Sequence, residues 1–398
     1  MNTLRILHLA QSIGRKSTGM GSGVIALVHA EQSQGCHPMI WTLDREPEIE
    51  LARENGLDVD SLRCFPPLGP ASIGFTPAME RAARNQSGQE FNLLHQHGLW
   101  MANSRVTNRW RQRWSRPVLL SPHGTLEPYA LKISRWKKRL ATWAYEARNL
   151  RQATCLHACS LSEMRSFRRF GLTQPIAVIP NGLSDSWLSS AGKGERFREE
   201  FGIAPGRRIL LFLSRIHPIK GLPLLFEAMA HLRSELDDWL LVIAGMDERG
   251  HQIELEQLVQ ELRISQWVQF VGPLFNENKR DAFSAAEVFV LPTHSENFGL
   301  VVVEALSASL PVLTTRGAPW EELIEEHCGW WVDINPVALR EALTKIIHMP
   351  AEELAEMGTR GRELAITRYA SRDVAEKTIL VYQWLLSQGP RPEFVEMN

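Results

Sequence analysis

The sequence contains no apolar run close to the roughly 20 residues that a helix needs to cross a bilayer. Its first residues, MNTLRILHLAQSIG, hold only a short apolar stretch with no small-residue cleavage site after it, so we expect a buried strand there and not a signal peptide. Cysteine is scarce, and five scattered residues in 398 predict no disulfide framework. Short-period repeats and low-complexity segments are absent as well. Together these absences predict a cytoplasmic globular protein.

The chain does contain enough material for two domains. At 398 residues, with 44% hydrophobic and 22% charged residues, it is too long for one ordinary core and has a globular composition. The net charge of −1 conceals an uneven distribution, because residues 1–190 hold 23 Lys and Arg against 14 Asp and Glu, whereas residues 191–398 hold 21 against 31. A basic half and an acidic half suggest domains that meet different partners, although unrelated solvated faces would give the same totals.

Short apolar runs alternate with longer amphipathic stretches along the chain. Residues 4–10 are expected to form a buried strand, followed by a glycine-rich loop over Gly19–Gly23, a helix over 24–34 and a strand over 37–43. A second series begins after the polar stretch 189–195. Two successive series predict two doubly wound α/β domains, whose ligands bind at the carboxyl ends of strands. Further strands are expected over 92–98, 117–123, 154–160, 176–182, 208–214, 239–245, 267–273, 288–293 and 310–315.

Two cationic residues of the second series lie where a strand ends. Arg215 and Lys220 follow the strand predicted over 208–214 and precede a helix predicted over 222–232. A strand-end loop that leads into a helix N-terminus attracts anions, because free N–H groups and the helix dipole point outward. Two cations beside it suit a diphosphate. The alternative is a surface arginine and lysine near a turn.

Two carboxylates follow the strand predicted over 288–293. Glu296 lies in the loop, and Glu304 lies in a helix that is apolar on almost every side. A glutamate in a buried helix is costly unless it is satisfied. The hydroxyls of a sugar and a ribose would satisfy it, whereas pairing with an arginine is the structural alternative.

These motifs resemble a known donor signature. Glu296-x7-Glu304 together with Arg215-x4-Lys220-Gly221 is similar to the signature of the family 4 retaining glycosyltransferases of the GT-B fold, of the kind that builds bacterial surface polysaccharides. The resemblance runs along most of the chain, in the same order, through the glycine loop, Pro122-His123-Gly124 and Pro180-Asn181-Gly182.

The resemblance implies an α/β fold of two Rossmann-like domains that face a cleft. It places an N-terminal acceptor-binding domain over residues 1–186 and a C-terminal donor-binding domain over 187–372. Within residues 373–398 it implies a helix that crosses back to the first domain, followed by a tail.

The resemblance also implies roles for single residues. Arg215 and Lys220 would hold the donor pyrophosphate, Glu304 the ribose and Glu296 the transferred sugar. His123 would face the donor sugar from the other domain and orient it near the reacting carbon. Backbone amides that contact sugar and phosphate would come from Asn297, Phe298, Gly299 and Leu300.

On the acceptor side, two further elements are candidates. His97 ends a predicted strand and begins the segment HGLW, which is similar to a stretch found in polysaccharide-building members of the family. We expect His97 either in the acceptor pocket or in the core. The glycine loop would let the backbone approach an acceptor or donor phosphate closely, although a plain tight turn has the same spacing. Its candidate residues are Gly19, Gly21, Ser22 and Gly23.

The reaction must stabilise an oxocarbenium-like centre and a departing nucleotide diphosphate. Arg215, Lys220 and the helix N-terminus supply this stabilisation electrostatically, so neither a metal nor a cofactor is expected. Cys155-x-His157-x-Cys159 suits alternate positions on one strand better than a zinc site, since no fourth ligand is evident. The resemblance implies a same-face mechanism in which the leaving phosphate takes the acceptor proton, while a nucleophilic Glu296 stays open.

A basic, tryptophan-containing stretch covers residues 103–116 and 131–151. Its second part contains an apolar stripe at helical spacing, with lysines and arginines around its first half. The stripe consists of Trp136, Leu140, Trp143, Ala147 and Leu150. Such a helix binds an anionic membrane surface, or it packs its stripe against the domain core. Nucleic acid is not expected, because no RNA-binding motif is present.

The sequence therefore predicts a retaining hexosyl- or related glycosyltransferase. Its donor would be a UDP- or GDP-sugar and its acceptor a lipid-linked or saccharide group, in surface polysaccharide or lipopolysaccharide biosynthesis at the inner face of the cell membrane. The alternatives are a non-catalytic scaffold that binds nucleotide sugar, or another GT-B enzyme such as a sugar-nucleotide epimerase.

Overall fold

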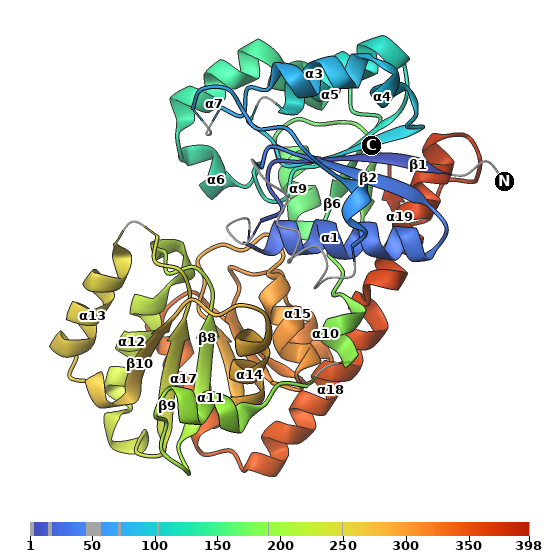
Figure 1. Ribbon diagram of the computed structural model, residues 1–398. Coiled ribbons are helices and arrows are strands. Elements are labelled where there is room, and N and C mark those ends of the chain that lie inside the picture. The colour runs from blue at the N-terminus through green and yellow to red at the C-terminus, as the bar shows by residue number, and fades with distance from the viewer. Residues whose placement is uncertain are drawn as a thin grey trace. The chain divides into compact units, whose positions relative to one another are not determined.

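A computed structural model describes residues 4–14, 18–44, 57–70, 73–101, 103–189, 191–248 and 250–397. The chain forms two compact units (Figure 1). The first contains residues 1–185 and 370–398, and the second contains residues 186–369. The C-terminal segment thus belongs to the first unit, and the boundaries lie at 185 and 369 where the sequence suggested 186 and 372.

The first unit is built on an eight-stranded sheet in the order β14-β7-β6-β5-β4-β1-β2-β3. Its strands are parallel except for β14, which pairs antiparallel with β7. Their bounds are β1 Arg5–Ala10, β2 His37–Thr42, β3 Leu62–Cys64, β4 Leu93–His97, β5 Val118–Ser121, β6 Cys155–Ala158, β7 Ile176–Val178 and β14 Val395–Glu396.

Alternation along these strands divides the core of the first unit into two layers. On β1, Leu7 and Leu9 pack with Val106 and Trp110 of α5 (Asn103–Trp114) and with residues of α3 (Pro77–Arg84). Leu4 and Ile6 point to the opposite face and pack with residues of α1 (Thr18–Ser33) and α19 (Ser371–Leu385). That second face is apolar only along the first half of each strand. Its carboxyl half carries His8, His95, His97, Ser121 and His157.

Short helices complete the first unit. They are η2 Val59–Ser61, α4 Gln86–Gln89, α6 Pro128–Lys132, α7 Arg135–Ala141, the π-helical turn η3 Thr142–Glu146, α8 Ala147–Arg151 and α9 Leu161–Arg169.

The second unit is a six-stranded parallel sheet in the order β10-β9-β8-β11-β12-β13. Numbered along the chain, this is the doubly wound order 3-2-1-4-5-6. The strands are β8 Arg208–Leu213, β9 Trp239–Ala244, β10 Val268–Gly272, β11 Val288–Leu291, β12 Val312–Thr315 and β13 Gly329–Val332. The helices are α10 Asp185–Ser189, α11 Gly194–Glu200, η4 Pro218–Lys220, α12 Leu222–His231, η5 Arg233–Glu235, α13 His251–Glu261, η6 Ser265–Trp267, α14 Asn276–Ala285, α15 Leu300–Ser307, α16 Glu322–Glu325, α17 Pro336–Ile347 and α18 Ala351–Tyr369. Two Rossmann-like α/β units confirm the predicted fold class.

The glycine-rich segment is helical, so the expectation of a loop over Gly19–Gly23 is wrong. Helix α1 begins at Thr18 and includes all three glycines, and residues 15–17 before it lie outside the described part of the chain. Glycine disfavours helix by only about 1 kcal/mol per residue relative to alanine. The apolar residues that follow in α1, such as Val24, Ile25 and Val28, are fully or almost fully buried, and their packing outweighs that cost.

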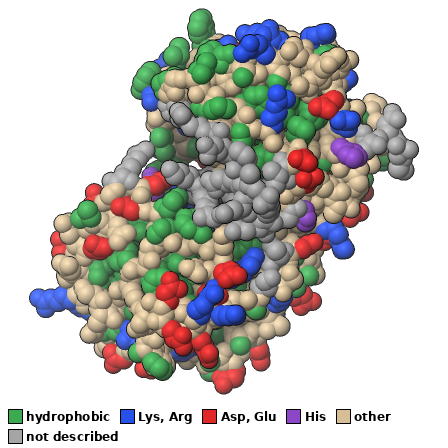
Figure 2. All heavy atoms as spheres, viewed as in Figure 1, with side chains coloured by type: hydrophobic (Ala, Val, Ile, Leu, Met, Phe, Trp, Pro, Cys, Tyr) green, Lys and Arg blue, Asp and Glu red, His purple; other side chains and the backbone are tan. Residues whose placement is uncertain are grey.

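The basic stretch divides into a buried and an exposed part. Trp110 is fully buried, and Trp114 donates its indole N–H to the Ala83 carbonyl at 2.8 Å, so α5 is a core helix. In contrast, Trp136, Leu140 and Trp143 are 68%, 59% and 85% exposed. Figure 2 shows hydrophobic, Lys and Arg side chains together on the part of the surface that α7 occupies in Figure 1.

The apolar stripe expected along residues 136–150 does not stay on one face. Leu150, which would continue it, is 2% exposed and packs in the core. The π-helical turn Thr142–Glu146 separates the two parts. A π-helical turn holds more residues than an α-helical one, so it rotates the following residues away from the direction that a 3.6-residue period predicts. Within the described residues, no helix is both long and apolar enough to span a bilayer.

Candidate functional site

The two charged motifs of the second unit meet at the centre of its sheet. Strands β8 and β11 are hydrogen-bonded neighbours, and the order of the strands reverses between them. Residues 214–221 follow β8, and residues 292–299 follow β11. In doubly wound sheets ligands bind at this point, outside the carboxyl ends of the strands.

Backbone hydrogen bonds hold the two loops together. The His294 amide donates to the Ile219 carbonyl at 2.7 Å, and the Thr293 hydroxyl lies 3.1 Å from the same oxygen. Gly221 has a φ of +71°, and a Cβ added to it would lie 2.0 Å from the Pro292 carbonyl oxygen. The loops therefore approach each other at a position where only glycine fits.

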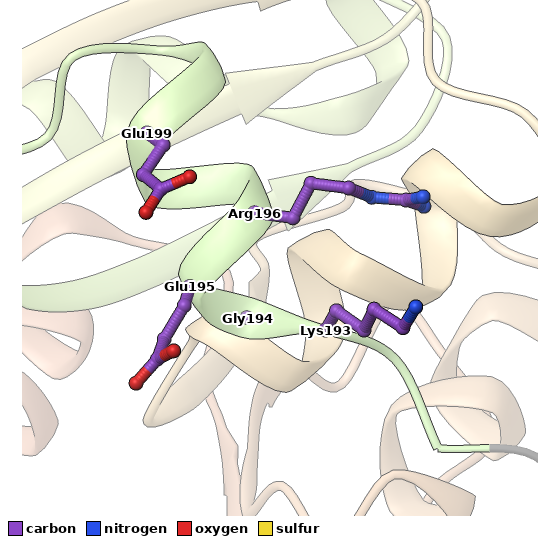
Figure 3. A pocket seen from close by; sticks show the side chains of 5 residues that line it. All are labelled: Lys193, Gly194, Glu195, Arg196 and Glu199. Carbon is purple, nitrogen blue, oxygen red and sulfur yellow. The ribbon is translucent and has the colours of Figure 1, made fainter.

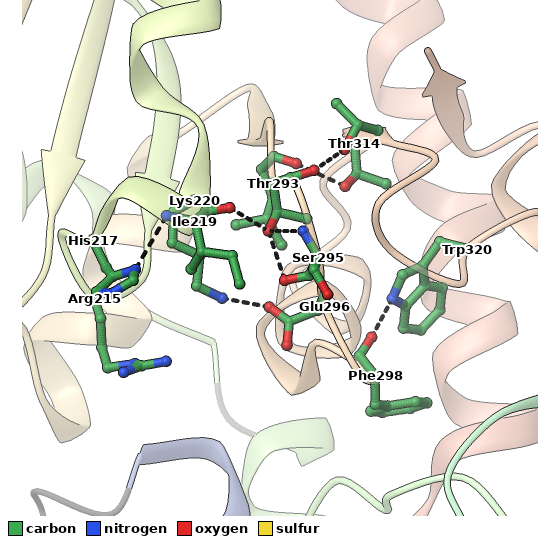
Figure 4. A network of polar contacts seen from close by, with 12 residues as sticks. Arg215, His217, Ile219, Lys220, Thr293, Ser295, Glu296, Phe298, Thr314 and Trp320 are labelled. Carbon is green, nitrogen blue, oxygen red and sulfur yellow. Dashed lines mark hydrogen bonds and ion pairs between the residues drawn. The ribbon is translucent and has the colours of Figure 1, made fainter. Parts of the chain in front are cut away.

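An ion pair between Lys220 and Glu296 lies at the junction of the loops (Figure 4). Lys220 Nζ is 2.5 Å from Glu296 Oε2, and the side chains are only 7% and 18% exposed. The sequence motifs thus bring together one residue expected at the pyrophosphate and one expected at the sugar. A cation and a carboxylate side by side can bind a phosphate on one side and a hydroxyl on the other.

Arg215 forms a more exposed ion pair. Its Nη1 donates to Glu248 Oε1 at 2.7 Å, and the two side chains are 39% and 36% exposed. Exposed pairs of this kind contribute little free energy, so the guanidinium can exchange its partner for an anionic ligand at small cost. Sequence reasoning missed Glu248, because nothing in its local segment marks it.

Glu304 is buried in α15, as the sequence predicted, but its partner is a lysine and not an arginine. Lys279 Nζ of α14 lies 2.5 Å from Glu304 Oε2, and the Glu304 side chain is 6% exposed. The ion pair satisfies a carboxylate that would otherwise be buried alone. Lys279 is a further candidate residue of the site that the motifs did not reveal.

The start of α15 offers backbone N–H groups to a ligand. Gly299 is its N-cap residue, with a φ of +81°, and provides no side-chain cap. The first N–H groups of a helix have no partner within it, and the helix dipole is positive there. The approach to α15 is held in place, because the Glu296 amide donates to the Gly317 carbonyl at 2.7 Å and the Trp320 indole donates to the Phe298 carbonyl at 2.6 Å.

In the first unit His123 stands at the end of β5 in an uncommon backbone conformation. Its φ is +52°, and Gly124 follows with a φ of +76°. Few residues other than glycine adopt this region, and such strain is concentrated at functional sites. The Gly124 amide donates to Glu163 Oε1 at 2.6 Å, which fixes the turn.

His123 is the end of a hydrogen-bonded row of histidines. Its Nε2 lies 3.0 Å from His97 Nδ1, and His97 Nε2 lies 3.0 Å from His8 Nδ1. His8 Nε2 lies 2.8 Å from Glu31 Oε2 of α1. Except for His123, which is half-buried, these side chains are at most 1% exposed. Burial lowers the pKa of His123 to about 3, with a further contribution from His157, so its imidazole is neutral.

A second row starts at the same glutamate. The Tyr382 hydroxyl of α19 lies 2.9 Å from Glu31 Oε1 and 2.8 Å from His95 Nδ1. Ser121 Oγ lies between His95 Nε2 at 2.6 Å and His157 Nδ1 at 2.7 Å. His157 Nε2 lies 2.7 Å from the Ile179 carbonyl oxygen.

These contacts decide between the two places expected for His97. Its side chain is 1% exposed and touches His8, His95 and His123, which is the core location and not an acceptor pocket. Sequence reasoning missed His8, His95, Glu31, His157 and Tyr382 as its companions. Alternating histidines on β4 were a signal, but the partners from other elements are distant in sequence.

Possible metal ligands are also visible among the described residues. Cys155 and His157 lie on β6, and His157 already bonds to Ser121 and Ile179. Imidazole nitrogens of His8, His95 and His97 lie within 4.8 Å of one another. An Asp-x-Asp sequence, a common metal and diphosphate motif, occurs at Asp58–Asp60, where both aspartates are exposed, and it belongs to the first unit, whereas the donor motifs belong to the second.

A separate hollow of about 430 Å³ lies at the start of α11 (Figure 3). Glu195 and Glu199 point to one side of the helix, and Lys193 and Arg196 point to the other. Arg196 is engaged with Asp281 and Glu277. None of the residues that line this hollow belongs to the two donor motifs.

Known proteins share these features along most of the chain. The family described as "Glycosyl transferases group 1" matches residues 193–364, and "Glycosyl transferase 4-like domain" matches residues 18–182. D-inositol 3-phosphate glycosyltransferase of Kineococcus radiotolerans is 25% identical over 94% of this chain and 92% of its own.

Solved structures share the fold. HepE of Anabaena, in complex with UDP-glucose, superposes with a TM-score of 0.77 over 96% of this chain and all of its own, at 19% identity. WaaG, a glycosyltransferase involved in lipopolysaccharide biosynthesis, does so with a TM-score of 0.69 over 94% and 99%, at 17% identity. With both halves matched by family and the doubly wound order in place, the chain belongs to the family 4 glycosyltransferases of the GT-B fold.

Proposed function

We propose that the protein transfers a hexosyl or related sugar, with retention, from a UDP- or GDP-sugar to a lipid-linked or saccharide acceptor. The observation that carries this proposal is the pairing of Lys220 with Glu296 at the switch point of the second sheet. It sets a phosphate-binding cation directly beside a hydroxyl-binding carboxylate. A relative that acts on an inositol phosphate and a neighbour solved with UDP-glucose support a nucleotide-sugar donor.

The donor pyrophosphate would bind between Lys220, Arg215 and the start of α15. Arg215 would leave Glu248, with which it forms an exposed pair, and donate to a phosphate oxygen. The free N–H groups after Gly299 would donate to the same group. These donors can stabilise a leaving diphosphate without a metal, and we propose that none is needed.

The nucleoside and sugar would bind to the two carboxylates. Glu304, buried in α15 and held by Lys279, would accept from the ribose hydroxyls. Glu296 would accept from a hydroxyl of the transferred sugar. Because Lys220 already engages one of its oxygens, we favour this binding role over a nucleophilic one, and the leaving phosphate would take the acceptor proton on the same face.

The acceptor side would be in the first unit. The start of α1, with Gly19, Gly21, Ser22 and Gly23, would present backbone N–H groups to a phosphate. The exposed residues of α7 and the turn after it, together with their basic neighbours, would bind an anionic membrane surface. A lipid-linked acceptor in surface polysaccharide or lipopolysaccharide assembly fits both features, and WaaG is a neighbour with such a role.

Thermal stabilisation by nucleotides tests the donor site. At about 100 times its dissociation constant, the right nucleoside diphosphate should add roughly 2.7 kcal/mol to the stability of the wild type. UDP, GDP and ADP are compared on the wild type, on Arg215→Ala/Lys220→Ala and on a charge-matched control, Arg233→Ala/Lys345→Ala, at exposed positions of the same unit. Stabilisation of the wild type and the control but not of the first variant is expected. Equal stabilisation of all three would contradict the site.

Turnover separates an enzyme from a non-catalytic scaffold. In Glu296→Gln the sugar hydroxyl loses its carboxylate while Lys220 stays available to the diphosphate. We expect affinity for the nucleotide to be kept and turnover with its sugar to fall about 100-fold, the loss typical of a polar group that acts in the transition state. A scaffold would bind the nucleotide sugar and show no transfer in the wild type either.

A further inference from the structure

Five histidines of the first unit belong to one series of hydrogen bonds, which is unbranched among the described residues and whose two arms meet at Glu31. The series has eight links, all of 3.0 Å or less. From one end to the other it passes through His123, His97, His8, Glu31, Tyr382, His95, Ser121, His157 and the Ile179 carbonyl.

Each link needs one proton, so the geometry sets the number of protons in the series. A neutral imidazole or a hydroxyl supplies one proton. The five histidines, Ser121 and Tyr382 therefore supply seven for eight links. The eighth proton belongs either to Glu31 as a neutral carboxylic acid or to a histidine cation beside a Glu31 carboxylate.

The Ile179 carbonyl fixes the direction of the second arm, because it can only accept. His157 Nε2, 2.7 Å away, must therefore carry a proton. If His157 is neutral, its Nδ1 accepts from Ser121, and Ser121 accepts from His95 Nε2. The Tyr382 hydroxyl then donates to His95 Nδ1. The Tyr382 oxygen is left as an acceptor 2.9 Å from Glu31 Oε1, so this carboxyl oxygen must hold the eighth proton.

The alternative with a histidine cation is opposed by burial. His95 is fully buried and His157 is 4% exposed. Burial lowers the pKa of His95 well below 6.5, and the neighbouring histidines lower it further. Burial likewise lowers the pKa of His157 to about 4. A series with only seven protons would set two lone pairs against each other across one of these short links, which is costly in a buried site.

The first arm extends the same pattern of donors and acceptors from Glu31 to His123. Glu31 Oε2 accepts from His8 Nε2, His8 Nδ1 accepts from His97 Nε2, and His97 Nδ1 accepts from His123 Nε2. His123 is then protonated on Nε2 only. Its Nδ1, which lies 3.7 Å from Cys159 Sγ, is left as an acceptor.

We propose that Glu31 is held as a neutral acid and, through His8 and His97, locks His123 in the tautomer whose Nδ1 carries no proton and acts as an acceptor. This inference rests on the proposed function together with the role that the resemblance implies for His123, which is to orient the transferred sugar. Glu31, His8 and His97 are then positioning residues, and His123 can accept a hydrogen bond from a sugar hydroxyl at Nδ1 but cannot donate one there. Wrong tautomers at catalytic histidines abolish most activity in other enzymes.

A metal ion is the competing interpretation of the same histidines. Nitrogen atoms of His8, His95 and His97 come within 4.8 Å of one another. Both ring nitrogens of all three are already engaged in the eight links, so an ion would have to break several short hydrogen bonds. The hydrogen-bonded series therefore accounts for the geometry better.

Nitrogen NMR of the whole chain tests the tautomer directly. In protein labelled with ¹⁵N-histidine, we expect His123, assigned with His123→Gln, to show a protonated Nε2 and an unprotonated Nδ1. Glu31→Gln keeps the eight links, because its amide donates to Tyr382 and its carbonyl accepts from His8, so the His123 signals should stay unchanged. Glu31→Ala removes both contacts and should give the averaged shifts of two tautomers. His8→Leu, which keeps side-chain volume, should do the same if Glu31→Ala does not fold.

Measurements of activity and of zinc content complete the test. Glu31→Ala should lower kcat about 10- to 100-fold, the range known for outer partners that orient metal-bound histidines, and Glu31→Gln should rescue it. The proposal is overturned if His123 carries its proton on Nδ1, if Glu31→Gln disturbs His123 as much as Glu31→Ala, or if the purified protein contains one equivalent of zinc. If the spectra are as expected but no nucleotide sugar is turned over, the proposed function is contradicted. The proposed tautomer of His123 is then still supported.

Discussion

At the scale of single residues, the close contact between the two donor loops depends on one glycine. Gly221 combines a left-handed backbone with a carbonyl oxygen 2.0 Å from where a Cβ would be. Gly206 has a similar φ of +85° but no atom within 4 Å of that position. The two glycines therefore separate the cost of the backbone conformation from the cost of the contact.

Replacing each glycine by alanine should give different losses of stability. Gly206→Ala should cost about 1–2 kcal/mol for the left-handed backbone alone. Gly221→Ala adds overpacking against Pro292 and should cost about 2–5 kcal/mol, with loss of nucleotide binding. Urea unfolding of both variants measures the free energies. Equal losses of unfolding free energy in the two variants would show that the two donor loops can move apart without a measurable cost.

The buried histidines should make stability depend on pH. The pKa of His123 is lowered to about 3 and that of His157 to about 4, mainly by burial, against about 6.5 in the unfolded chain. Between these values the unfolded chain binds more protons than the folded one. The contribution of these two histidines to stability is therefore full above about pH 6.5 and falls as the pH is lowered towards 4, by up to roughly 1.4 kcal/mol per pH unit for each histidine.

The urea midpoint measured from pH 7.5 to 4.5 checks this slope. His157→Gln should reduce it, because one suppressed titration is removed. His348→Gln, at a side chain that is 62% exposed, is the control and should leave the slope as it is. A midpoint independent of pH in the wild type would contradict the neutral, buried state of these imidazoles.

At the scale of elements, α7 and the π-helical turn after it present apolar side chains to the surface of the first unit. Trp136, Leu140 and Trp143 face outward, whereas Leu150 beyond the π-helical turn packs inside. The wild type should co-sediment with anionic vesicles, and Trp136→Ser/Leu140→Ser/Trp143→Ser should lower binding roughly 10-fold or more. Leu161→Ser/Ile253→Ser removes two other exposed apolar side chains and should change nothing. If the wild type does not bind the vesicles, the proposed binding to an anionic membrane surface is contradicted.

Regular elements were predictable because their signal is local. The apolar runs of β1, β8 and β9 and the charged loops after β8 and β11 follow from short patterns. Three strands were not expected: β3, β13 and β14 have at most four residues, and their pairing comes from distant neighbours. For the same reason the motifs identified Lys220, Glu296 and Glu304 but not Lys279. The start of α1 was misassigned because burial of its later residues outweighs three glycines.

At the scale of the whole molecule, the chain leaves the first unit and returns to complete it. Val374, Ala375, Val381, Tyr382 and Val395 are all in its core. Deleting residues 370–398 should therefore destabilise the first unit and spare the second. Hydrogen exchange should show lost protection in β1 and β4 with β8 and β9 unchanged. Equal loss in both sheets would contradict two separately stabilised units.

The return of the chain also has a consequence for biosynthesis. On the ribosome, the segments before residue 186 emerge before the second unit, but Tyr382, the partner of Glu31, is made only after it. At 5–20 residues per second, the intervening 184 residues take roughly 10–40 s to translate. Throughout that interval the nascent N-terminal half exposes the sheet face that α19 later covers. The second unit, contiguous in sequence, can fold first, so we expect chaperones to engage the N-terminal half until α19 has been made.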